Sequence, residues 1–484
     1  MQARNPRVRE VAATPAQLRA LAARWPERFP VLYDSAAPGP LGRYSILAAN
    51  PRASLRLRGD GRVECENVSL RSGDFLGALD EWWRAEADAA ADASASASDA
   101  EADARTTPPF RGGWVVYLGY ELAAQLEPGL RVPALPAAAT VALAIRVQAA
   151  LVYDHVAGRC QLLTESDAAA TADDIVTALA AVAQPPGPAA TTPSPENTAP
   201  GASAQGTVFE PDPARFRAIV LRAQEYIGAG DIYQANLSRG WRVALPAAAD
   251  PAVLYAQLRA ANPAPFAALA QFPGVTLLSS SPERLVSVRA GVVETRPIAG
   301  TRARQGAADT DHPEQQELLA NPKERAEHVM LIDLERNDLG RICVAGSVEV
   351  NEFMVTESYP HLHHIVSNVR GQLRAEVTPG GVLRAVFPGG TITGCPKYRC
   401  MQIIGELEHE PRGAYTGSLG YLNLNGDMDF NILIRTATLS GGALRFRAGA
   451  GIVADSDWQR ELAETRAKAQ GMLRAFGAHD AEPS

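Results

Sequence analysis

The sequence lacks the features of nucleic-acid-binding, membrane and secreted proteins. Its 46 Lys and Arg residues are outnumbered by 54 Asp and Glu residues, and the net charge of −8 is poorly suited to hold a polyanion. No run of about eighteen apolar residues occurs, so we expect no membrane-spanning helix. The five cysteines form no CxxC pair, and the first residues lack the apolar core of a signal peptide. These absences favour a cytoplasmic protein with reduced thiols.

The remaining composition is that of a globular protein, with 46% hydrophobic residues among 484. Two stretches lack large apolar side chains: residues 85–108 are rich in Ala, Ser, Asp and Glu, and residues 184–207 in Pro, Thr and Ser. Neither stretch can offset the entropy cost of ordering by burial. We therefore predict a mobile insertion and a linker, which divide the chain into an N-terminal region (7–183) and a C-terminal region (208–478).

The pattern of apolar residues predicts a mixture of strands and helices without a regular βαβ repeat. This mixture favours an α+β fold with large antiparallel sheets. The predicted strands lie within residues 29–35, 42–51, 112–120, 140–155, 276–288, 417–439 and 442–454. The predicted helices of the C-terminal region include residues 211–231 and 320–340.

Four glutamates occupy matching positions on two predicted helices. Near the start of one helix, Asn321 can cap the first turn, Pro322 follows it, and Glu324 shares a face with Glu327. The last helix repeats the spacing, as the side chains at its i, i+3 and i+7 positions are Glu461, Glu464 and Lys468. One interpretation is structural, with Glu324 as a cap and the other pair solvated.

The alternative interpretation is that the two helix faces oppose each other. Carboxylates at about 4 Å would repel by several kcal/mol at an effective dielectric constant of about 20. Some of them would then protonate, or a dication would lie among them. An all-oxygen site that retains water suits Mg²⁺. The spacing alone leaves both interpretations open.

Eight motifs, in order along the chain, resemble those of the chorismate-utilising enzymes, which include anthranilate, aminodeoxychorismate, isochorismate and salicylate synthases. They cover nearly all of residues 210–475 and read ETRPIAGTRAR, KERAEHVMLIDLERNDLGRI, HHIVSNV, FPGGTITGCPK, GAYTGSLGY, ILIRTA, AGAGIVADSD and ELAETRAKA. The resemblance implies two large antiparallel sheets packed as a sandwich with surrounding helices. It also implies a cleft that holds chorismate and Mg²⁺.

The resemblance implies a role for each matching residue. It makes Glu327 and Glu464 direct Mg²⁺ ligands, with Glu324 and Glu461 acting through water. Arg435 and Tyr415 would bind the enolpyruvyl carboxylate, and Lys468 would face the ring carboxylate. Thr391 would contact the leaving C4 hydroxyl, and His364 would assist proton transfer beside it. The backbone would approach the substrate at Gly300, Thr301, Gly449, Ala450 and Gly451.

Two neighbouring signals are interpreted as structural. His361 and His363 lie beside His364, but no cysteine or carboxylate pattern completes a zinc site with them. The glycine-rich stretch at residues 385–397 lacks the GxxxxGK[ST] spacing of a nucleotide loop. We interpret it as one wall of a pocket for a small dicarboxylate.

Two positions bear on the reaction. Gln234 stands where water-adding relatives have a lysine, and an uncharged amide cannot activate water as a base. Ammonia is therefore the expected nucleophile, supplied by a separate glutamine amidotransferase subunit, since no glutaminase module is evident. The motifs YQANLSR, APFAAL, FPGGTITG and GDMDFNILIRT resemble aminodeoxychorismate synthase component I, which aminates C4 to give 4-amino-4-deoxychorismate, a precursor of 4-aminobenzoate and folate.

Ala299 departs from this pattern, because many aminodeoxychorismate synthases have a lysine there that is thought to attack the ring. The alternative is anthranilate synthase chemistry, which aminates C2 and releases pyruvate. The family also has a tryptophan pocket, and the corresponding residues here are Ser35, Pro265, Phe266 and Ala267. The motif LYDS differs from LLES, so a structural tryptophan or an empty pocket is expected as readily as feedback inhibition. A non-catalytic effector-binding homologue would have a broken metal site, whereas all four glutamates are present.

Overall fold

The computed structural model describes residues 7–37, 39, 41–94, 108–165, 168–183, 206–245, 249–303, 322–358 and 362–477. Within these ranges it leaves out the side chains of residues 89–94, 169–170, 299, 301–303, 322–324, 358 and 362–363. The helices, with 3₁₀ turns marked η, are α1 (Pro15–Arg24), α2 (Phe75–Ser94), η1 (Tyr120–Leu122), α3 (Ala123–Leu126), α4 (Ala169–Ala183), α5 (Pro213–Gly228), α6 (Pro251–Ala261), α8 (Pro322–Gly340), α9 (Pro379–Val386), η3 (Gly390–Ile392), α10 (Lys397–Glu408) and α11 (Trp458–Ala475).

The strands of the described residues are all joined by antiparallel pairing, which confirms the α+β prediction. They are β1 (Arg7–Val11), β2 (Val31–Asp34), β3 (Tyr44–Arg58), β4 (Val63–Glu66), β5 (Gly113–Leu118), β6 (Thr140–Asp154), β7 (Arg159–Thr164), β8 (Thr207–Phe209), β9 (Gln234–Ala244), β10 (Phe266–Phe272), β11 (Val275–Ser281), β12 (Arg284–Arg289), β13 (Val292–Thr295), β14 (Ile298–Ala303), β15 (Glu349–Ser358), β16 (Leu362–Gln372), β17 (Gly394–Cys395), β18 (Ser418–Asn423), β19 (Met428–Asn431), β20 (Thr436–Ser440) and β21 (Ala443–Ile452).

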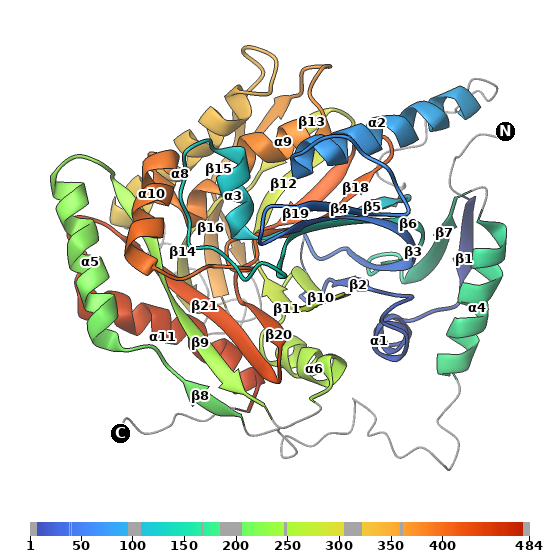
Figure 1. The fold of residues 1–484 in the computed structure, drawn as a ribbon, viewed down its shortest axis with the longest axis horizontal. Coiled ribbons are helices and arrows are strands. Elements are labelled where there is room, and N and C mark those ends of the chain that lie inside the picture. The colour runs from blue at the N-terminus through green and yellow to red at the C-terminus, as the bar shows by residue number, and fades with distance from the viewer. Residues whose placement is uncertain are drawn as a thin grey trace.

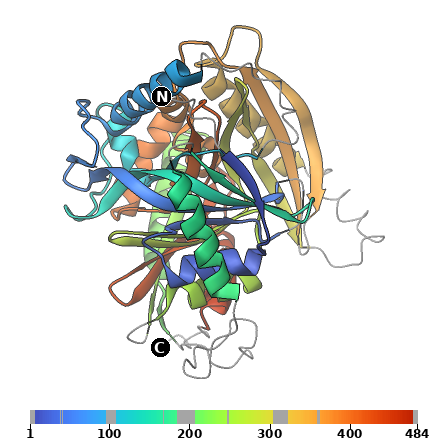
Figure 2. The same ribbon diagram turned by 90° about the vertical axis from the view of Figure 1, so that its right-hand side faces the viewer.

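The pairing defines two layers that can be followed in Figures 1 and 2. The first layer has the strand order β8, β9, β21, β20, β11, β10, β2, β3, β6, β7 and β1. The second layer has the order β4, β3, β6, β5, β18, β19, β12, β13 and β16, with β14 and β15 paired to β16. The predicted sandwich is therefore present, with its two sheets joined through shared strands.

Strands β3 and β6 belong to both layers because each is 15 residues long. The start of β3 pairs with β2 and its end with β4, while β6 pairs first with β5 and then with β7. Between these halves, Asn50 has a φ of 53° and the register shifts between Pro51 and Ala53. Inward side chains of both halves, such as Ile46 and Ile145, pack in one cluster between the layers.

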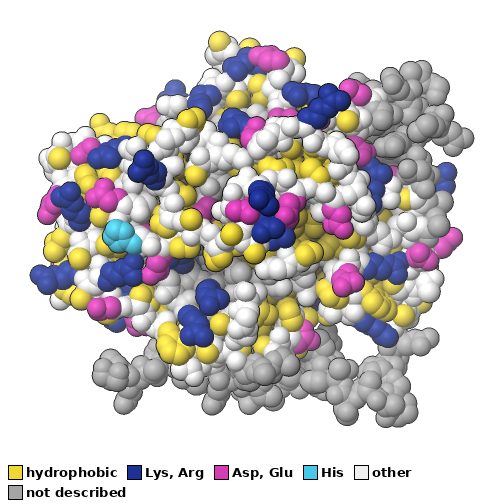
Figure 3. Space-filling model, in the orientation of Figure 1, with side chains coloured by type: hydrophobic (Ala, Val, Ile, Leu, Met, Phe, Trp, Pro, Cys, Tyr) yellow, Lys and Arg dark blue, Asp and Glu magenta, His cyan; other side chains and the backbone are white. Residues whose placement is uncertain are grey.

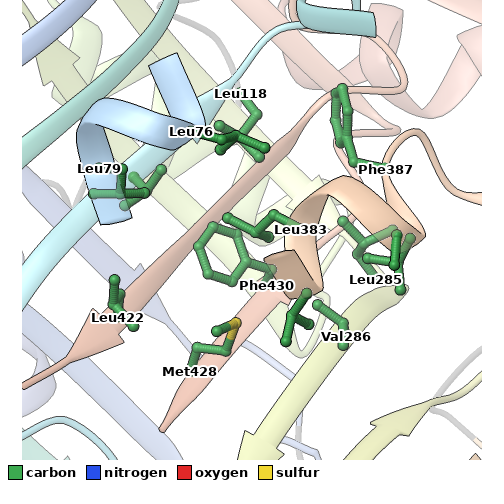
Figure 4. Close-up of a cluster of buried hydrophobic side chains, with 14 of the residues drawn as sticks. Leu76, Leu79, Leu118, Leu285, Val286, Leu383, Phe387, Leu422, Met428 and Phe430 are labelled. Carbon is green, nitrogen blue, oxygen red and sulfur yellow. The ribbon is translucent and has the colours of Figure 1, made fainter. Parts of the chain in front are cut away.

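Helices cover the outer faces of both layers. Helices α1, α4, α6 and α11 contribute side chains to the core on the first layer. Helices α2 and α9 cover the second layer, and Figure 4 shows Leu76, Leu79 and Leu383 from these helices beside Met428 and Phe430 of β19. Each fully buried side chain of this size contributes roughly 1.5–3 kcal/mol to stability. Helices α5 and α10 cover β9 and β21, at the end of the first layer.

The N-terminal and C-terminal regions share this sheet network. Strand β2 pairs with β10, and β5 pairs with β18 over the six positions Gly113–Leu118. Residues 85–94 of the predicted mobile insertion continue helix α2. The rest of that insertion up to residue 107, and residues 184–205 of the predicted linker, lie outside the described residues.

The strands predicted over 276–288 and 417–439 are each interrupted. The first divides into β11 and β12 at Pro282 and Glu283. The second turns between β18 and β19, as expected for a hairpin, and breaks again before β20, where Arg435 has a φ of 49°. The backbone N–H of Ile432 donates to the carbonyl of Glu283 at 3.0 Å, so the two interruptions lie side by side. The first break falls in the polar run SSSPER at residues 279–284, which the predicted strand includes, whereas apolar residues 432–434 lead directly into the second break and conceal it.

The described helices include none that is long and apolar enough to cross a membrane. On the face shown in Figure 3, acidic and basic side chains are interspersed with apolar ones.

Candidate active site

A cavity of about 470 Å³ lies where the first layer's β9 and β21 meet the second layer's β14 and β16, beside α8 and α11. Both layers and three helical segments contribute to its walls. The side chains and glycines that line it include Gln234, Asn236, Glu283, Gly300, Glu327, Leu331, His364, Thr391, Ile392, Tyr415, Arg435, Arg447, Gly449, Gly451, Glu464 and Lys468. The structure thus brings together eleven of the site residues predicted from the sequence.

Strand β21 lines the cavity with glycine at two positions, where an added Cβ would lie very close to neighbouring atoms. A Cβ at Gly449 would lie 2.6 Å from the Tyr415 hydroxyl and 2.8 Å from the Leu237 carbonyl. A Cβ at Gly451 would lie 2.3 Å from Nε2 of Gln234. Glycine is required at position 449, because the Leu237 carbonyl belongs to the backbone of the neighbouring strand. At position 451, the flexible end of Gln234 would have to shift to admit a side chain.

Two of the predicted carboxylates border the cavity from different helices. Glu327 of α8 accepts a hydrogen bond from Nε2 of Gln234 at 3.0 Å, so this contact leaves its negative charge uncompensated. Glu464 of α11 pairs with Lys468 at 2.7 Å, and Nζ of Lys468 also donates to the Gly449 carbonyl at 3.0 Å. The second amide atom of Gln234, Oε1, is buried without a hydrogen-bond partner among the described residues.

Glu283 is a cavity residue that the sequence analysis missed. It is 6% exposed, and its Oε1 has no hydrogen-bond partner among the described residues. Burial raises the pKa of Glu283 to about 7, although Thr391, Lys468 and Arg435 nearby lower it in part. The signal in the sequence was the polar run SSSPER at residues 279–284, which interrupts the apolar residues of the predicted strand with a proline and a charged pair. A carboxyl of this kind can hold and release a proton near neutral pH.

Arg435 and Thr391 offer hydrogen-bonding groups to the cavity. Burial lowers the pKa of Arg435, against the opposing effect of Glu283. The Arg435 guanidinium makes no hydrogen bond or ion pair with the described residues. Oγ1 of Thr391 lacks a partner of good hydrogen-bond geometry among them, but it lies close enough to Glu283 to lower the pKa of that carboxyl as a donor. A planar guanidinium in this setting suits a carboxylate bound in two hydrogen bonds.

His364 and Tyr415 complete the polar lining. His364 is 3% exposed on β16, where its backbone lies opposite Thr301 of β14 and Glu357 of β15. Tyr415 precedes β18, and its hydroxyl accepts a long hydrogen bond from Nδ2 of Asn236 at 3.5 Å.

Other predicted site residues lie elsewhere or outside the description. The Ala450 side chain packs in the core beneath α5 and α10, so only its neighbours on β21 reach the cavity. Glu461 is not part of the lining, and its Oε1 accepts a hydrogen bond from Ser456 at 2.8 Å. Glu324 and Thr301 belong to α8 and β14, but their side chains lie outside the described atoms, as does that of His363. Asn321 and His361 lie outside the described residues altogether.

The residues of the predicted effector pocket form a separate group. Oγ of Ser35 donates to the Tyr44 carbonyl at 2.6 Å and to the Pro265 carbonyl at 3.4 Å. Ala267 pairs with Asp34 of β2, and Phe266 lies under the guanidinium of Arg284 at 5.4 Å. None of the four predicted effector residues lines the cavity described above.

Lys397, the lysine of the glycine-rich stretch, has protein partners rather than a free ammonium group for an anion. Nζ of Lys397 pairs with Asp338 of α8 and donates to the Val386 carbonyl at 3.3 Å. Thr391 and Ile392 of the same stretch line the cavity. The stretch is therefore a cavity wall that Lys397 fastens to α8.

The donor chemistry of the cavity fits Mg²⁺, although the described residues include no cluster of three His, Cys, Asp or Glu side chains placed to hold a metal. Glu327 and Glu464 supply two carboxylates to the same cavity. Mg²⁺ is commonly held by one or two carboxylates together with water and substrate oxygens.

Comparisons with known proteins agree with this arrangement. The family model described as "chorismate binding enzyme" matches residues 32–474. Aminodeoxychorismate synthase component 1 of Bacillus subtilis is 38% identical, with 93% of this chain and 92% of that protein covered. Anthranilate synthase component 1 of Streptomyces coelicolor is 42% identical over 76% of this chain and 73% of that protein.

Solved structures show the same fold. The crystal structure of anthranilate synthase component I from Streptococcus pneumoniae has a TM-score of 0.74 and 31% identity, covering 89% of this chain and 92% of that one. The menaquinone-specific isochorismate synthase from Escherichia coli, at 18% identity and a TM-score of 0.68, shares the fold.

Proposed function

The chain belongs to the chorismate binding enzyme family and is an enzyme that acts on chorismate; we propose that it replaces the C4 hydroxyl of chorismate by ammonia to give 4-amino-4-deoxychorismate. The observation that carries the proposal is one cavity that combines an unpaired guanidinium, a buried carboxyl that titrates near neutral pH, and two carboxylates on separate helices. The similarity to aminodeoxychorismate synthase component 1 of Bacillus subtilis, over nearly the whole chain, supports this choice.

In this proposal, Arg435 and Tyr415 bind the enolpyruvyl carboxylate, and Lys468 faces the ring carboxylate. Arg435 can make two parallel hydrogen bonds to a carboxylate because no described residue occupies its guanidinium. Gly300, Gly449 and Gly451 leave room for the ring. Thr391, whose hydroxyl lies in the cavity beside Glu283, contacts the leaving C4 hydroxyl.

The metal in the proposal is Mg²⁺, held by Glu327 and Glu464, with Glu324 and Glu461 acting through water. When bound, it supplies positive charge for the ring carboxylate and polarises the substrate. Oε1 of Glu461, on the helix that also carries Glu464, accepts a hydrogen bond from Ser456 at 2.8 Å.

Proton transfer is assigned to Glu283 and His364. As the C4–O bond breaks, the leaving hydroxyl takes a proton from Glu283 and departs as water. A carboxyl with a pKa of about 7 is suited to this donation, because it holds a proton at neutral pH and releases it readily. His364, buried in the same cavity, assists the transfer.

Ammonia would enter beside Gln234. Its unpartnered Oε1 can accept a hydrogen bond from ammonia, whereas a neutral amide cannot deprotonate water. We propose that a separate glutamine amidotransferase subunit supplies this ammonia.

Product identification tests the proposal. The protein is incubated with chorismate, Mg²⁺ and an excess of an ammonium salt near neutral pH, where part of Glu283 keeps its proton. The product is then divided in two. We expect 4-aminobenzoate only after a 4-amino-4-deoxychorismate lyase is added. Direct formation of 2-aminobenzoate with pyruvate would establish anthranilate synthase chemistry, which Ala299 and the similarity to the Streptomyces coelicolor protein favour.

A pair of variants tests whether turnover requires Glu464. Glu464→Gln should abolish turnover, while Glu376→Gln, an exposed glutamate paired with Arg374, should leave it unchanged. Absence of any product with the unaltered protein would favour a non-catalytic effector-binding homologue. Full turnover by Glu464→Gln would refute the metal assignment.

A further inference from the structure

The turn that follows helix α10 is fixed from several sides before it reaches the cavity. Its residues 409–416 include three with positive φ, namely His409 at 55°, Gly413 at 60° and Thr416 at 62°. Such conformations persist in residues other than glycine when the surroundings hold them. The turn ends with Tyr415, which lines the cavity, and Thr416.

Arg412 is the centre of these contacts. Its buried guanidinium makes two hydrogen bonds to Glu408, at 2.7 and 3.0 Å. It also donates to the carbonyls of Asn236 at 2.6 Å and Ile392 at 3.3 Å, both of which line the cavity. It lies 5.5 Å from the centre of the Tyr415 ring. One side chain therefore contacts three segments of the cavity wall.

Glu408 is a buried carboxylate that Arg412 and Arg447 keep charged. Burial acts to raise its pKa, but Arg412 and Arg447 outweigh that effect and keep the pKa below its usual value. Arg447, which lines the cavity, pairs with the second oxygen of Glu408 at 3.1 Å. The carboxylate thus joins the turn to strand β21.

The N-terminal region supplies the opposite side of the support. Oε1 of Glu121 accepts hydrogen bonds from the backbone N–H groups of Arg412 at 2.7 Å and Gly413 at 3.1 Å. The backbone of Tyr120 donates to the Gly413 carbonyl at 2.9 Å, and its ring lies 4.9 Å from the Arg412 guanidinium. Neither Tyr120 nor Glu121 lines the cavity.

We propose that Arg412 and Glu121 are positioning residues for Tyr415, through which the N-terminal region controls binding of the substrate carboxylate. This assignment rests on the proposed function, because it takes Tyr415 as a substrate contact. Lysine at position 412 could keep one hydrogen bond but could not bridge Glu408 and two carbonyls at once. Burial raises the pKa of Glu121 to about 7, so above that pH glutamine at position 121 would keep the volume and lose the charge that attracts both N–H groups.

A double-mutant cycle with Tyr415→Phe tests the assignment in the full chain. A misplacement of about 1 Å at a reacting site costs on the order of 100-fold, so we expect Arg412→Lys to lower kcat/KM by about that factor. In the Tyr415→Phe background, the same change should cost less than about threefold, because residues that act as a unit are not additive. Glu121→Gln should lower kcat/KM in the same background-dependent way, and it serves if Arg412→Lys does not fold.

Arg146→Lys is the matched control. Arg146 is also fully buried, pairs with Glu165 and stacks on Trp114 at 5.0 Å, but it does not line the cavity. We expect it to lower the melting temperature and leave kcat/KM unchanged. Equal effects of Arg412→Lys in both backgrounds, or an unchanged kcat/KM, would overturn the assignment. Calorimetric titration with chorismate gives the same comparison as a Kd, so the absence of amination by the unaltered protein is a separate result that bears on the proposed function alone.

Discussion

Glu283 is a carboxyl that the fold buries in a cavity wall at a break between two strands. Burial penalises its charged form, and its pKa rises from 4.5 to about 7. The native state therefore binds a proton that the unfolded chain releases between these two pH values. A residue retained at such a cost to stability at neutral pH is a candidate for chemistry rather than for packing.

The pH dependence of stability tests this account of Glu283. Its contribution is fully present below pH 4.5 and is lost as the pH rises toward 7, which amounts to about 3 kcal/mol at about 1.4 kcal/mol for each pKa unit. We expect urea unfolding to show a smaller decline in unfolding free energy between pH 5 and pH 8 for Glu283→Gln than for the unaltered protein. The exposed Glu376→Gln should follow the unaltered protein, and parallel curves for all three would contradict the assignment.

At the scale of single elements, strand β21 and helix α11 have opposite tolerance for side chains. Glycines of β21 face the cavity with Tyr415 and Gln234 against them, whereas Gly471 of α11 has open space around its Cβ position. The helix carries Glu464 and Lys468 on one face, and Lys468 ties it to the Gly449 carbonyl. An added side chain at Gly449 would therefore meet the cavity residues, whereas one at Gly471 would meet no neighbouring atom.

A pair of alanine substitutions measures this difference. Gly449→Ala should displace the Tyr415 hydroxyl, from which its Cβ would lie only 2.6 Å, and should lower kcat/KM for chorismate by about 100-fold. Gly471→Ala should raise stability by about 0.5–1 kcal/mol, because alanine is the better helix former, and should leave kcat/KM unchanged. Thermal melts and steady-state kinetics check both, and unaltered kinetics for Gly449→Ala would show that the strand can move aside.

At the scale of the whole molecule, strand pairing joins the N-terminal and C-terminal regions into one body. Strand pairs β2–β10 and β5–β18 cross between the regions, and the cluster between the layers draws side chains from both. The support of Tyr415 by Glu121 also crosses this boundary. Neither region alone supplies all the side chains of the hydrophobic cluster between the layers.

Splitting the chain tests this unity. If residues 1–183 and 206–484 are expressed together as separate chains, we expect them to co-purify and to unfold in a single thermal transition, because their strands pair directly. Size-exclusion chromatography and calorimetry provide the measurements. Elution as two folded, unassociated fragments would contradict the prediction.

The sequence predicted most strands and helices and most residues of the cavity, but it did not predict where the strands are interrupted. Long apolar runs gave strands β2, β5 and β6, and the helix over 211–231 contains α5. The resemblance supplied Glu327, Glu464 and Arg435, which the cavity brings together. Glu283 was missed because the prediction extended one strand through the polar run at residues 279–284. The role of Arg412 depends on contacts between segments far apart in the chain.

At the strand breaks, substitutions of Glu283 or Arg435 that raise stability are expected to lower activity. A search for more heat-resistant variants would reward apolar residues at position 283 and glycine at position 435, since these remove a buried charge or relieve a left-handed backbone. Such variants would gain stability by removing the carboxyl and the guanidinium that line the cavity. Engineering for durability should therefore leave these two sites untouched and work on the helical exterior instead.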